Sequence, residues 1–286
     1  MALMQMVQLE IQLDNNNYLP GNEVSGSLIL VVDKATNIRS LNLLVEGKEK
    51  TSITVSTGKS SVTYHEENPI LDIKQSFMGE GIVQPGRYSE DFSFLLPEQA
   101  LPTYEGRNAK ISYEVKAWID IPKHIDIKSR KKFMVKSLHK GSGRPGEAVS
   151  QVQNDISYTK RKLEPTISVK LPFDQYNTGE TIRTSVMYTN PIRRKIRKVG
   201  AELFSKECTQ AKRTKSTQKL SVRRFSLPLE NIYEGLFSDF QIKIPENYNP
   251  SFKGSFSNNN VYLRFYLDIR WARDIFVEFP ITVDHL

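Results

Sequence analysis

The chemically most suggestive residues of this sequence are arginines and lysines that gather in its middle. Residues 121–224 contain 25 Lys+Arg against 8 Asp+Glu, whereas the rest of the chain contains 15 against 24. Clustered cations attract anions, but they also keep exposed strand edges from pairing with other chains. We therefore predict either an anion-binding surface or a protected sheet edge. The candidate residues are Arg193, Arg194, Lys195, Arg197 and Lys198 in "NPIRRKIRKVG" and Lys212, Arg213 and Lys215 in "AKRTKSTQK".

Three kinds of anionic partner are compatible with these clusters. A membrane surface rich in anionic lipid gains about 1 kcal/mol per nearby Lys or Arg. An acidic or phosphorylated peptide would use the same charges. Nucleic acid is the third candidate, because single-stranded readers interleave aromatic residues for base stacking, and the stretch 193–224 contains only Phe204.

Catalytic and metal-binding patterns are weak in comparison. His65-Glu66-Glu67 could suggest metal ligands, but we interpret it as a solvated loop, and Cys208 among lysines reads as a strand residue. "GSGRPG" matches the dinucleotide-binding pattern G-x-G-x-x-G in sequence, but it lacks the strand before it and the helix after it that the motif requires. We predict no catalytic residue, no metal and no cofactor, with an unrecognised enzyme or small-ligand carrier as the alternative.

A long internal repeat indicates the elements that carry these residues. "QLEIQLDNNNYLPG" and "TISVKLPFDQYNTG" alternate apolar and polar residues at the same offset, with Tyr18 answered by Tyr176 and Gly21 by Gly179. Later, "LPTYEGRNAKISYEVKAWIDI" is answered by "NPSFKGSFSNNNVYLRFYLDI". Period-two alternation between turn signals is typical of many short strands. We predict an all-β fold of two tandem immunoglobulin-like β-sandwich domains.

The limits of these domains follow from composition. We expect a first sandwich over 1–137, a connector rich in polar residues, Gly and Pro over 138–162, and a second sandwich over 163–286. The N-terminus lacks the basic start and continuous apolar block of a signal peptide, and one cysteine allows no internal disulfide. We therefore expect a cytoplasmic protein, and a peripheral location at a membrane is compatible with the basic clusters.

Taken in order, the repeated segments resemble the arrestin superfamily, which includes α-arrestins and Vps26-type proteins. The resemblance rests on "YLPGNEVSGSLILV", "LPTYEGRNAKISYEVKAWIDIP", "NTGETIRTSVMYTNPIRRKIRKVGAELF" and "SFKGSFSNNNVYLRFYLDI", and it covers roughly 8–137 and 163–284. It implies a non-enzymatic adaptor or scaffold that binds a protein partner, such as a membrane-protein tail or a subunit of a trafficking complex. The sequence has no PP-x-Y motif, and we expect no regulatory tail beyond the last strand.

The resemblance also draws attention to a hairpin in the first domain. The stretch "KTSITVSTGKSSVTYHEEN" has two β-rich runs around a polar centre, and arrestins carry a cargo-inserting loop in this region. An ordinary surface hairpin is the alternative interpretation. The candidate contact residues are Thr57, Gly58, Lys59, Ser60 and Ser61.

Overall fold

The computed structural model describes residues 7–137, 165–227 and 231–285 of the chain, and the regular elements in these ranges are all β-strands. The chain divides into two compact units. The first comprises Met1–Leu138, Thr209–Lys215 and Lys253–Ser257, and the second comprises the other residues. The all-β prediction is confirmed, while the expected connector over 138–162 lies wholly outside the described residues. Within the described ranges, no helix has the length and apolar character that a membrane span needs.

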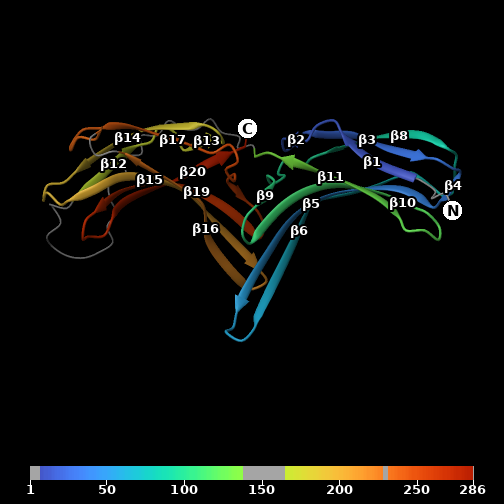
Figure 1. Ribbon diagram of the computed structural model, residues 1–286, viewed down its shortest axis with the longest axis horizontal. Coiled ribbons are helices and arrows are strands. Elements are labelled where there is room, and N and C mark those ends of the chain that lie inside the picture. The colour runs from blue at the N-terminus through green and yellow to red at the C-terminus, as the bar shows by residue number, and fades with distance from the viewer. Residues whose placement is uncertain (1–6, 138–164, 228–230, 286) are drawn as a thin grey trace, which may run out of the picture. The chain divides into compact units, whose positions relative to one another are not determined.

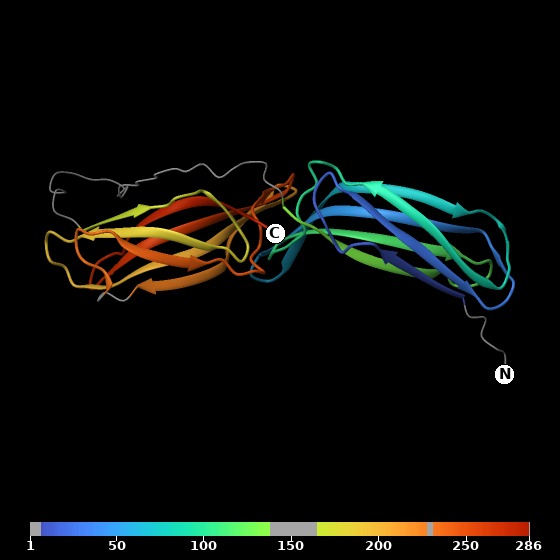
Figure 2. The same cartoon turned by 90° about the horizontal axis from the view of Figure 1, so that it is seen from above.

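The first unit is a sandwich of two sheets (Figure 1). A three-stranded sheet has the order β1–β3–β8, and Figure 2 looks onto this sheet from above. The larger sheet has the order β2–β11–β10–β5–β6, with β9 pairing with β10, and β4 pairs with β7. The bounds are β1 (Val7–Leu13), β2 (Asn17–Tyr18), β3 (Glu23–Val32), β4 (Thr36–Ile38), β5 (Ser40–Ser56), β6 (Ser61–Met78), β7 (Gly81–Val83), β8 (Gly86–Leu95), β9 (Tyr104–Glu105), β10 (Ala109–Asp120) and β11 (Ile127–Val135).

The second unit repeats this strand order. Its small sheet has the order β12–β14–β17, and its large sheet has the order β13–β20–β19–β15–β16, with β18 pairing with β19. The fold of tandem sandwiches therefore agrees with the repeat in the sequence. The bounds are β12 (Thr166–Lys170), β13 (Gln175–Asn177), β14 (Thr181–Thr189), β15 (Ile196–Ala211), β16 (Thr214–Leu227), β17 (Ser238–Lys243), β18 (Phe252–Lys253), β19 (Ser257–Ile269) and β20 (Ile275–Asp284).

Alternation along the strands builds each core. In β19 the odd-numbered residues Val261, Leu263, Phe265 and Leu267 are fully buried, while the residues between them reach the surface. Each such side chain stabilises the sandwich by about 1.5–3 kcal/mol relative to an exposed one. The same alternation leaves the other face of each large sheet to carry polar and aromatic side chains.

The repeated turn near the start of each unit has the same geometry twice. Tyr18 is buried and pairs in parallel with Val135, and Tyr176 is buried and pairs in parallel with Val283. Gly21 and Gly179 follow with φ angles of 80° and 81°, a left-handed conformation that glycine adopts without a steric penalty. The sequence repeat therefore encodes one specific local structure.

Strands β5 and β6 form a long hairpin, as the sequence predicts. From Thr54 to Thr63 the hairpin is exposed on both faces, and its two strands are closed by a turn in which Gly58 has a φ angle of 84°. Thr57 donates its backbone N–H to Ser60 O at 2.8 Å. The five candidate contact residues thus occupy the turn of an ordered hairpin.

Candidate anion-binding surfaces

Three turns meet at one end of the second unit and form what we call the tip surface. They are residues 190–195 before β15, residues 233–236 before β17 and residues 270–274 between β19 and β20. Arg270 donates its backbone N–H to Lys195 O at 2.9 Å, and Asn190 donates its backbone N–H to the Glu234 carboxylate at 2.6 Å. Hydrogen bonds therefore connect all three turns.

Asn190 organises the turn that carries the first basic cluster. Its side-chain amide donates to Arg194 O at 2.8 Å, and its carbonyl oxygen accepts from Arg194 N at 3.0 Å. Arg193 has a positive φ of 53°, and strand structure resumes at Ile196. Residues 191–195 therefore form an exposed turn from which three cations project.

The tip surface combines cations with exposed apolar and aromatic side chains. Its turns contain five cations and two carboxylates. Trp271 is 89% exposed, and Ile192, Tyr233 and Leu236 in the other two turns are exposed as well. Tryptophan and tyrosine favour the boundary between water and lipid, where one end of the ring is apolar and the other is wet. The cations of the tip are Arg193, Arg194, Lys195, Arg270 and Arg273.

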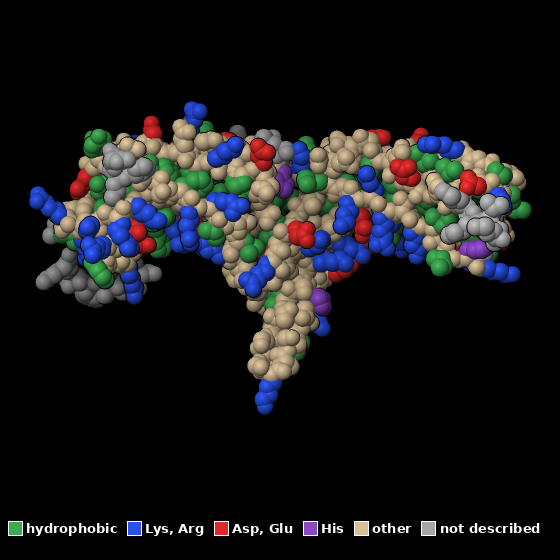
Figure 3. Space-filling model, in the orientation of Figure 1, with side chains coloured by type: hydrophobic (Ala, Val, Ile, Leu, Met, Phe, Trp, Pro, Cys, Tyr) green, Lys and Arg blue, Asp and Glu red, His purple; other side chains and the backbone are tan. Residues whose placement is uncertain are grey.

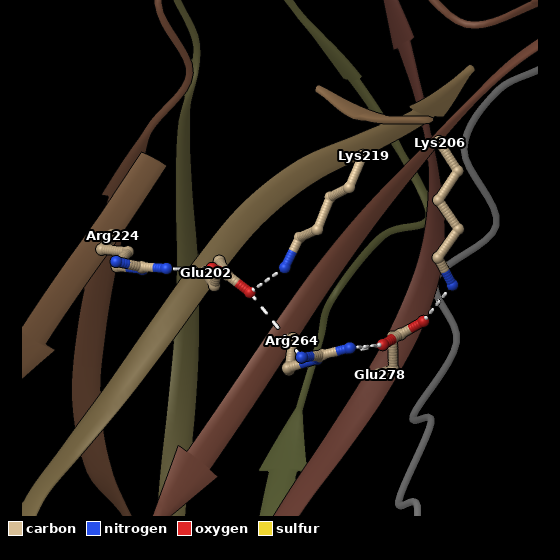
Figure 4. A network of polar contacts seen from close by, with 6 residues as sticks. All are labelled: Glu202, Lys206, Lys219, Arg224, Arg264 and Glu278. Carbon is tan, nitrogen blue, oxygen red and sulfur yellow. Dashed lines mark hydrogen bonds and ion pairs between the residues drawn. The ribbon is translucent and has the colours of Figure 1, made fainter. Parts of the chain in front are cut away.

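A second group of charges lies on the outward face of the large sheet of the same unit (Figure 4). Lys219 Nζ lies 2.5 Å and Arg224 Nε 3.2 Å from the carboxylate of Glu202. Arg264 Nη1 approaches the same carboxylate at 3.8 Å and binds Glu278 through Nε and Nη2, and Lys206 Nζ binds Glu278 at 2.9 Å. We call these six residues, from strands β15, β16, β19 and β20, the Glu202 cluster.

The charges of the Glu202 cluster are layered. The Glu202 side chain is 7% exposed and that of Glu278 is 20% exposed, whereas Lys219 is 38% and Arg224 is 74% exposed. The carboxylates therefore lie below and the cations above, next to solvent. Four cations against two carboxylates leave an excess of two positive charges on this face.

Aromatic rings support the cations from beneath. Phe204 is fully buried and stacks on Tyr262 with ring centroids 5.5 Å apart. Lys219 Nζ lies 4.0 Å from the Phe204 centroid, and Lys206 Nζ lies 4.2 Å from the Tyr262 centroid. Such cation–π contacts, each of about 0.5–2 kcal/mol, hold the long side chains in place.

The two carboxyl groups stay ionised at neutral pH. Burial acts to raise the pKa of Glu202, but hydrogen bonds from Lys219 and Arg224 outweigh burial and hold that pKa below its ordinary value. Burial acts to raise the pKa of Glu278 too, and hydrogen bonds from Lys206 and Arg264 again lower it. The cluster therefore keeps its charge pattern throughout the physiological pH range.

A hollow of about 340 Å³ opens beside the cluster. Figure 3 shows one face of the molecule in space-filling form, with the lysine and arginine side chains of its surface in blue. Cations, carboxylates and two aromatic rings surround the hollow. Its lining residues are Lys198, Glu202, Lys219, Arg224, Arg264, Tyr266, Asp268, Asp274 and Phe276.

The structure divides the cations that the sequence placed together. Arg193, Arg194 and Lys195 project from the tip, whereas Arg197 pairs with Asp268 at 2.5 Å and Lys198 lies over the Tyr266 ring. Lys212, Arg213 and Lys215 lie at the turn between β15 and β16, far along the strands from the tip turn, with Lys212 at a φ of 54°.

Sequence reasoning missed the acidic half of the Glu202 cluster and two of its cations. A signal was present, because Glu202 in β15 and Arg264 in β19 each stand between two buried apolar residues. Charged residues at regular outward positions of a central strand indicate a charged sheet face.

The weak catalytic patterns find no converging partners in the described ranges. His65, Glu66 and Glu67 lie in strand β6 and not in a solvated loop, which corrects that interpretation. No group of three or more His, Cys, Asp or Glu in these ranges could hold a metal ion. Cys208 is half-buried, and its sulfur accepts a hydrogen bond from Thr217 at 3.7 Å.

The fold places the chain in the class of tandem β-sandwich proteins, and comparisons with known proteins identify its family. The model of "Arrestin (or S-antigen), N-terminal domain" matches residues 7–141, and that of the arrestin C-terminal domain matches residues 163–286. The chain belongs to the arrestin family, as the sequence resemblance predicts. Members of this family are typically non-enzymatic adaptors or scaffolds that bind protein partners.

Curated relatives with arrestin domains come from distant organisms. "Arrestin domain-containing protein 17" of Caenorhabditis elegans is 26% identical over 66% of this chain and 49% of its own length. "Arrestin domain-containing protein 1" of Rattus norvegicus is 25% identical over 74% and 49%. "Arrestin domain-containing protein A" of Dictyostelium discoideum is 23% identical over 96% and 50%. The chain spans about half the length of these relatives.

Proposed function

We propose that this protein is an adaptor that binds a protein partner while its second unit docks on an anionic membrane surface. The partner is the acidic or phosphorylated tail of a membrane protein, or a trafficking cargo. The observation that carries the membrane part is the tip surface, where cations and exposed aromatic side chains lie on hydrogen-bonded turns.

The tip has the two properties that peripheral docking needs. Cations near an anionic bilayer each contribute about 1 kcal/mol, and interfacial aromatic rings add apolar contact at the headgroup level. Arg193, Arg194 and Lys195 make no side-chain ion pair in the described residues, so their charges are free for lipid. The cytoplasmic side of cellular membranes carries the anionic lipid, which agrees with a cytoplasmic location.

The protein-binding part of the proposal rests on the family and on the charged sheet faces. An adaptor needs no converging catalytic groups, and its partners bind at exposed surfaces. The hairpin turn of residues 57–61 offers polar contacts, and the large sheets offer cations. An enzyme or small-ligand carrier has less support, since charges that line the hollow beside the Glu202 cluster, such as Glu202, Lys219 and Arg224, already pair with one another.

Sedimentation with vesicles tests the membrane part. Wild-type protein is expected to sediment with vesicles of phosphatidylserine and phosphatidylcholine at low salt, and binding is expected to fade as salt screens the charges. Replacing Arg193, Arg194 and Lys195 by glutamine is expected to weaken binding about 100-fold, from about 1 kcal/mol per cation. A protein that ignores anionic vesicles at low salt would exclude membrane docking.

A matched control separates the tip from net charge. Replacing Lys212, Arg213 and Lys215 by glutamine removes the same charge from a different turn. That variant is expected to bind vesicles within a few-fold of wild type. If both triple variants lose binding equally, the tip has no special role.

A further inference from the structure

The Glu202 cluster has a composition that a purely structural ion-pair network does not require. Glu202 and Glu278 together could neutralise two cations, yet four cations surround them. The two additional charges are held at the solvent side of the carboxylates. We propose that this face binds an extended acidic peptide segment of a partner protein, and that Glu202 is an internal competitor for the cations that the peptide uses. This inference deepens the proposed adaptor function and rests on it.

Unused hydrogen-bond donors point toward solvent at this face. In the described part of the chain, Arg224 pairs only through Nε, so its Nη1 and Nη2 are free for a second carboxylate. Lys219 and Lys206 each use one of three ammonium protons on a carboxylate. An arriving carboxylate can therefore make its first contacts through these free donors, and it then competes with Glu202 for the cations that they share.

The position of Arg224 depends on an irregularity in its strand. Arg224 and Lys219 are five positions apart in β16, and in a regular strand residues an odd number apart face opposite ways. Ser221, between them, has a positive φ of 54°. A bulge at Ser221 returns Arg224 to the face of Lys219, which makes three cations converge on Glu202.

The dimensions of the cluster fit an extended chain. The cluster crosses the four adjacent strands β16, β15, β19 and β20, which spans about 14 Å at the usual strand spacing of about 4.8 Å. About four residues of an extended peptide cover that length. Phe276, 48% exposed, lines the neighbouring hollow and offers a contact for an apolar side chain next to the acidic one.

A localised acidic group suits this face better than a bilayer does. The charge of a bilayer is diffuse, so a bilayer binds most strongly to many unpaired cations on a protruding turn, as at the tip. The Glu202 cluster instead has few surplus charges, which converge beside a hollow, above one buried and one half-buried carboxylate. Convergent donors of this kind can form several charge-assisted hydrogen bonds with a single carboxylate.

The test measures binding of a short fluorescein-labelled peptide that alternates glutamate and threonine, by fluorescence anisotropy at low salt. Lys219→Gln and Arg224→Gln are each expected to weaken binding about threefold to fivefold, which corresponds to an ion pair of up to about 1 kcal/mol. Glu202→Gln is expected to tighten binding by a similar factor, because it removes the competitor. A peptide of alternating glutamine and threonine is expected not to bind.

Arg223→Gln is the matched control for Arg224→Gln. The two arginines are neighbours with equal charge, but Arg223 faces the other way. Desolvation is the main reason that the pKa of buried Tyr248 is raised, and the charge of Arg223 partly counteracts it, which places Arg223 toward Tyr248. Arg223→Gln is expected to change peptide affinity less than twofold, as is usual for an exposed charge outside a site.

The results separate this inference from the adaptor function. Equal losses for Arg223→Gln and Arg224→Gln, or unchanged or weaker binding by a folded Glu202→Gln, would overturn the inference. So would anionic vesicles that bind through Lys219 and Arg224 while the peptide does not. If Glu202→Gln does not fold, Glu278→Gln makes the same prediction of tighter binding. Persisting vesicle sedimentation through the tip would leave the adaptor function intact in each case.

Discussion

Lys219 and Arg224 lie on the same face of strand β16, although an odd number of positions separates them. Both contact the carboxylate of Glu202, and Ser221 between them adopts a left-handed backbone conformation. One residue of irregular backbone thus decides whether an arginine faces the Glu202 cluster or the opposite side of the sheet.

The bulge predicts opposite effects for two substitutions at Ser221. Glycine adopts a positive φ without strain, so Ser221→Gly is expected to leave the free energy of unfolding unchanged or raise it by up to about 1 kcal/mol. Valine disfavours a positive φ, so Ser221→Val is expected to lower the free energy of unfolding by about 1–3 kcal/mol. Urea denaturation measures both, and Ser226→Val, at an exposed β16 position without positive φ, is the control. A harmless Ser221→Val would show that the bulge is not fixed.

The lowered pKa values of Glu202 and Glu278 predict a dependence of stability on pH. A carboxyl group whose pKa is lower in the folded state stabilises the protein above the unfolded pKa, about 4.3 for Glu, and that contribution is lost as pH falls through the folded pKa. Stability is therefore expected to be flat near neutral pH and to fall below about pH 4.5.

Glu202→Gln is expected to remove part of this dependence. It should lower the free energy of unfolding by about 1–3 kcal/mol at pH 7, since it weakens charged hydrogen bonds, and by less at pH 3–4. Urea denaturation at both pH values checks this, with Glu80→Gln in an exposed turn as the control. An equal loss at both pH values would contradict the role of ionised Glu202.

Gly47 predicts a steric effect in the first unit. It pairs directly with Tyr113 across β5 and β10, and a Cβ atom at position 47 would lie 2.6 Å from two atoms of the buried ring. The ring is held by a hydrogen bond from its hydroxyl to Leu101 O, so it cannot move aside cheaply. Gly47→Ala is expected to cost about 1–3 kcal/mol in thermal or urea denaturation.

Two other glycines are controls for that prediction. Gly200→Ala faces Tyr266 in the second unit at similar distances, but Tyr266 is only half-buried and can swing outward, so a smaller loss is expected. Gly79→Ala has open space and is expected to stay within about 0.5 kcal/mol of wild type. Equal effects at all three positions would indicate backbone entropy instead of a steric conflict.

Trp271 predicts a spectroscopic signature of docking. The chain has two tryptophans, so Trp118→Phe leaves Trp271 as the single emitter. Trp271 is 89% exposed, and its emission is expected to shift to shorter wavelength on anionic vesicles and not on neutral ones. Unchanged emission despite sedimentation would mean that another surface docks.

The turn of the β5–β6 hairpin can be replaced without loss of fold. Residues 57–61 are exposed, and Asn-Gly is a favoured two-residue hairpin turn. Replacing residues 57–61 by Asn-Gly is therefore expected to keep the melting temperature within a few degrees of that of the wild type. If the turn contacts a partner, co-precipitation of partners from native cells should decrease. Retained capture by the shortened hairpin would leave an ordinary surface hairpin as the explanation.

Local patterns predicted the fold well because each rests on neighbours in sequence. The equivalent turns of the two units contain Tyr18 with Gly21 and Tyr176 with Gly179. Glycine is favoured at such a position because it adopts a positive φ without strain. The Glu202 cluster could not be predicted in the same way. Its contacts depend on which strands become neighbours, on their register and on the bulge at Ser221. A serine in the sequence does not predict a positive φ. The limits of the two domains and the binding roles of the named cations stay predictions.

Asn190 gives the tip a mechanical property as well as a shape. The Asn190 side chain braces the first turn, the Glu234 carboxylate connects it to the second, and a backbone hydrogen bond connects it to the third, so the tip has little conformational entropy to lose on contact. Docking through such a stiff, preorganised wedge should be rapid and reversible, with a strength set by the charge density of the lipid surface. An adaptor of this kind responds to the composition of a membrane more than to its own rearrangement.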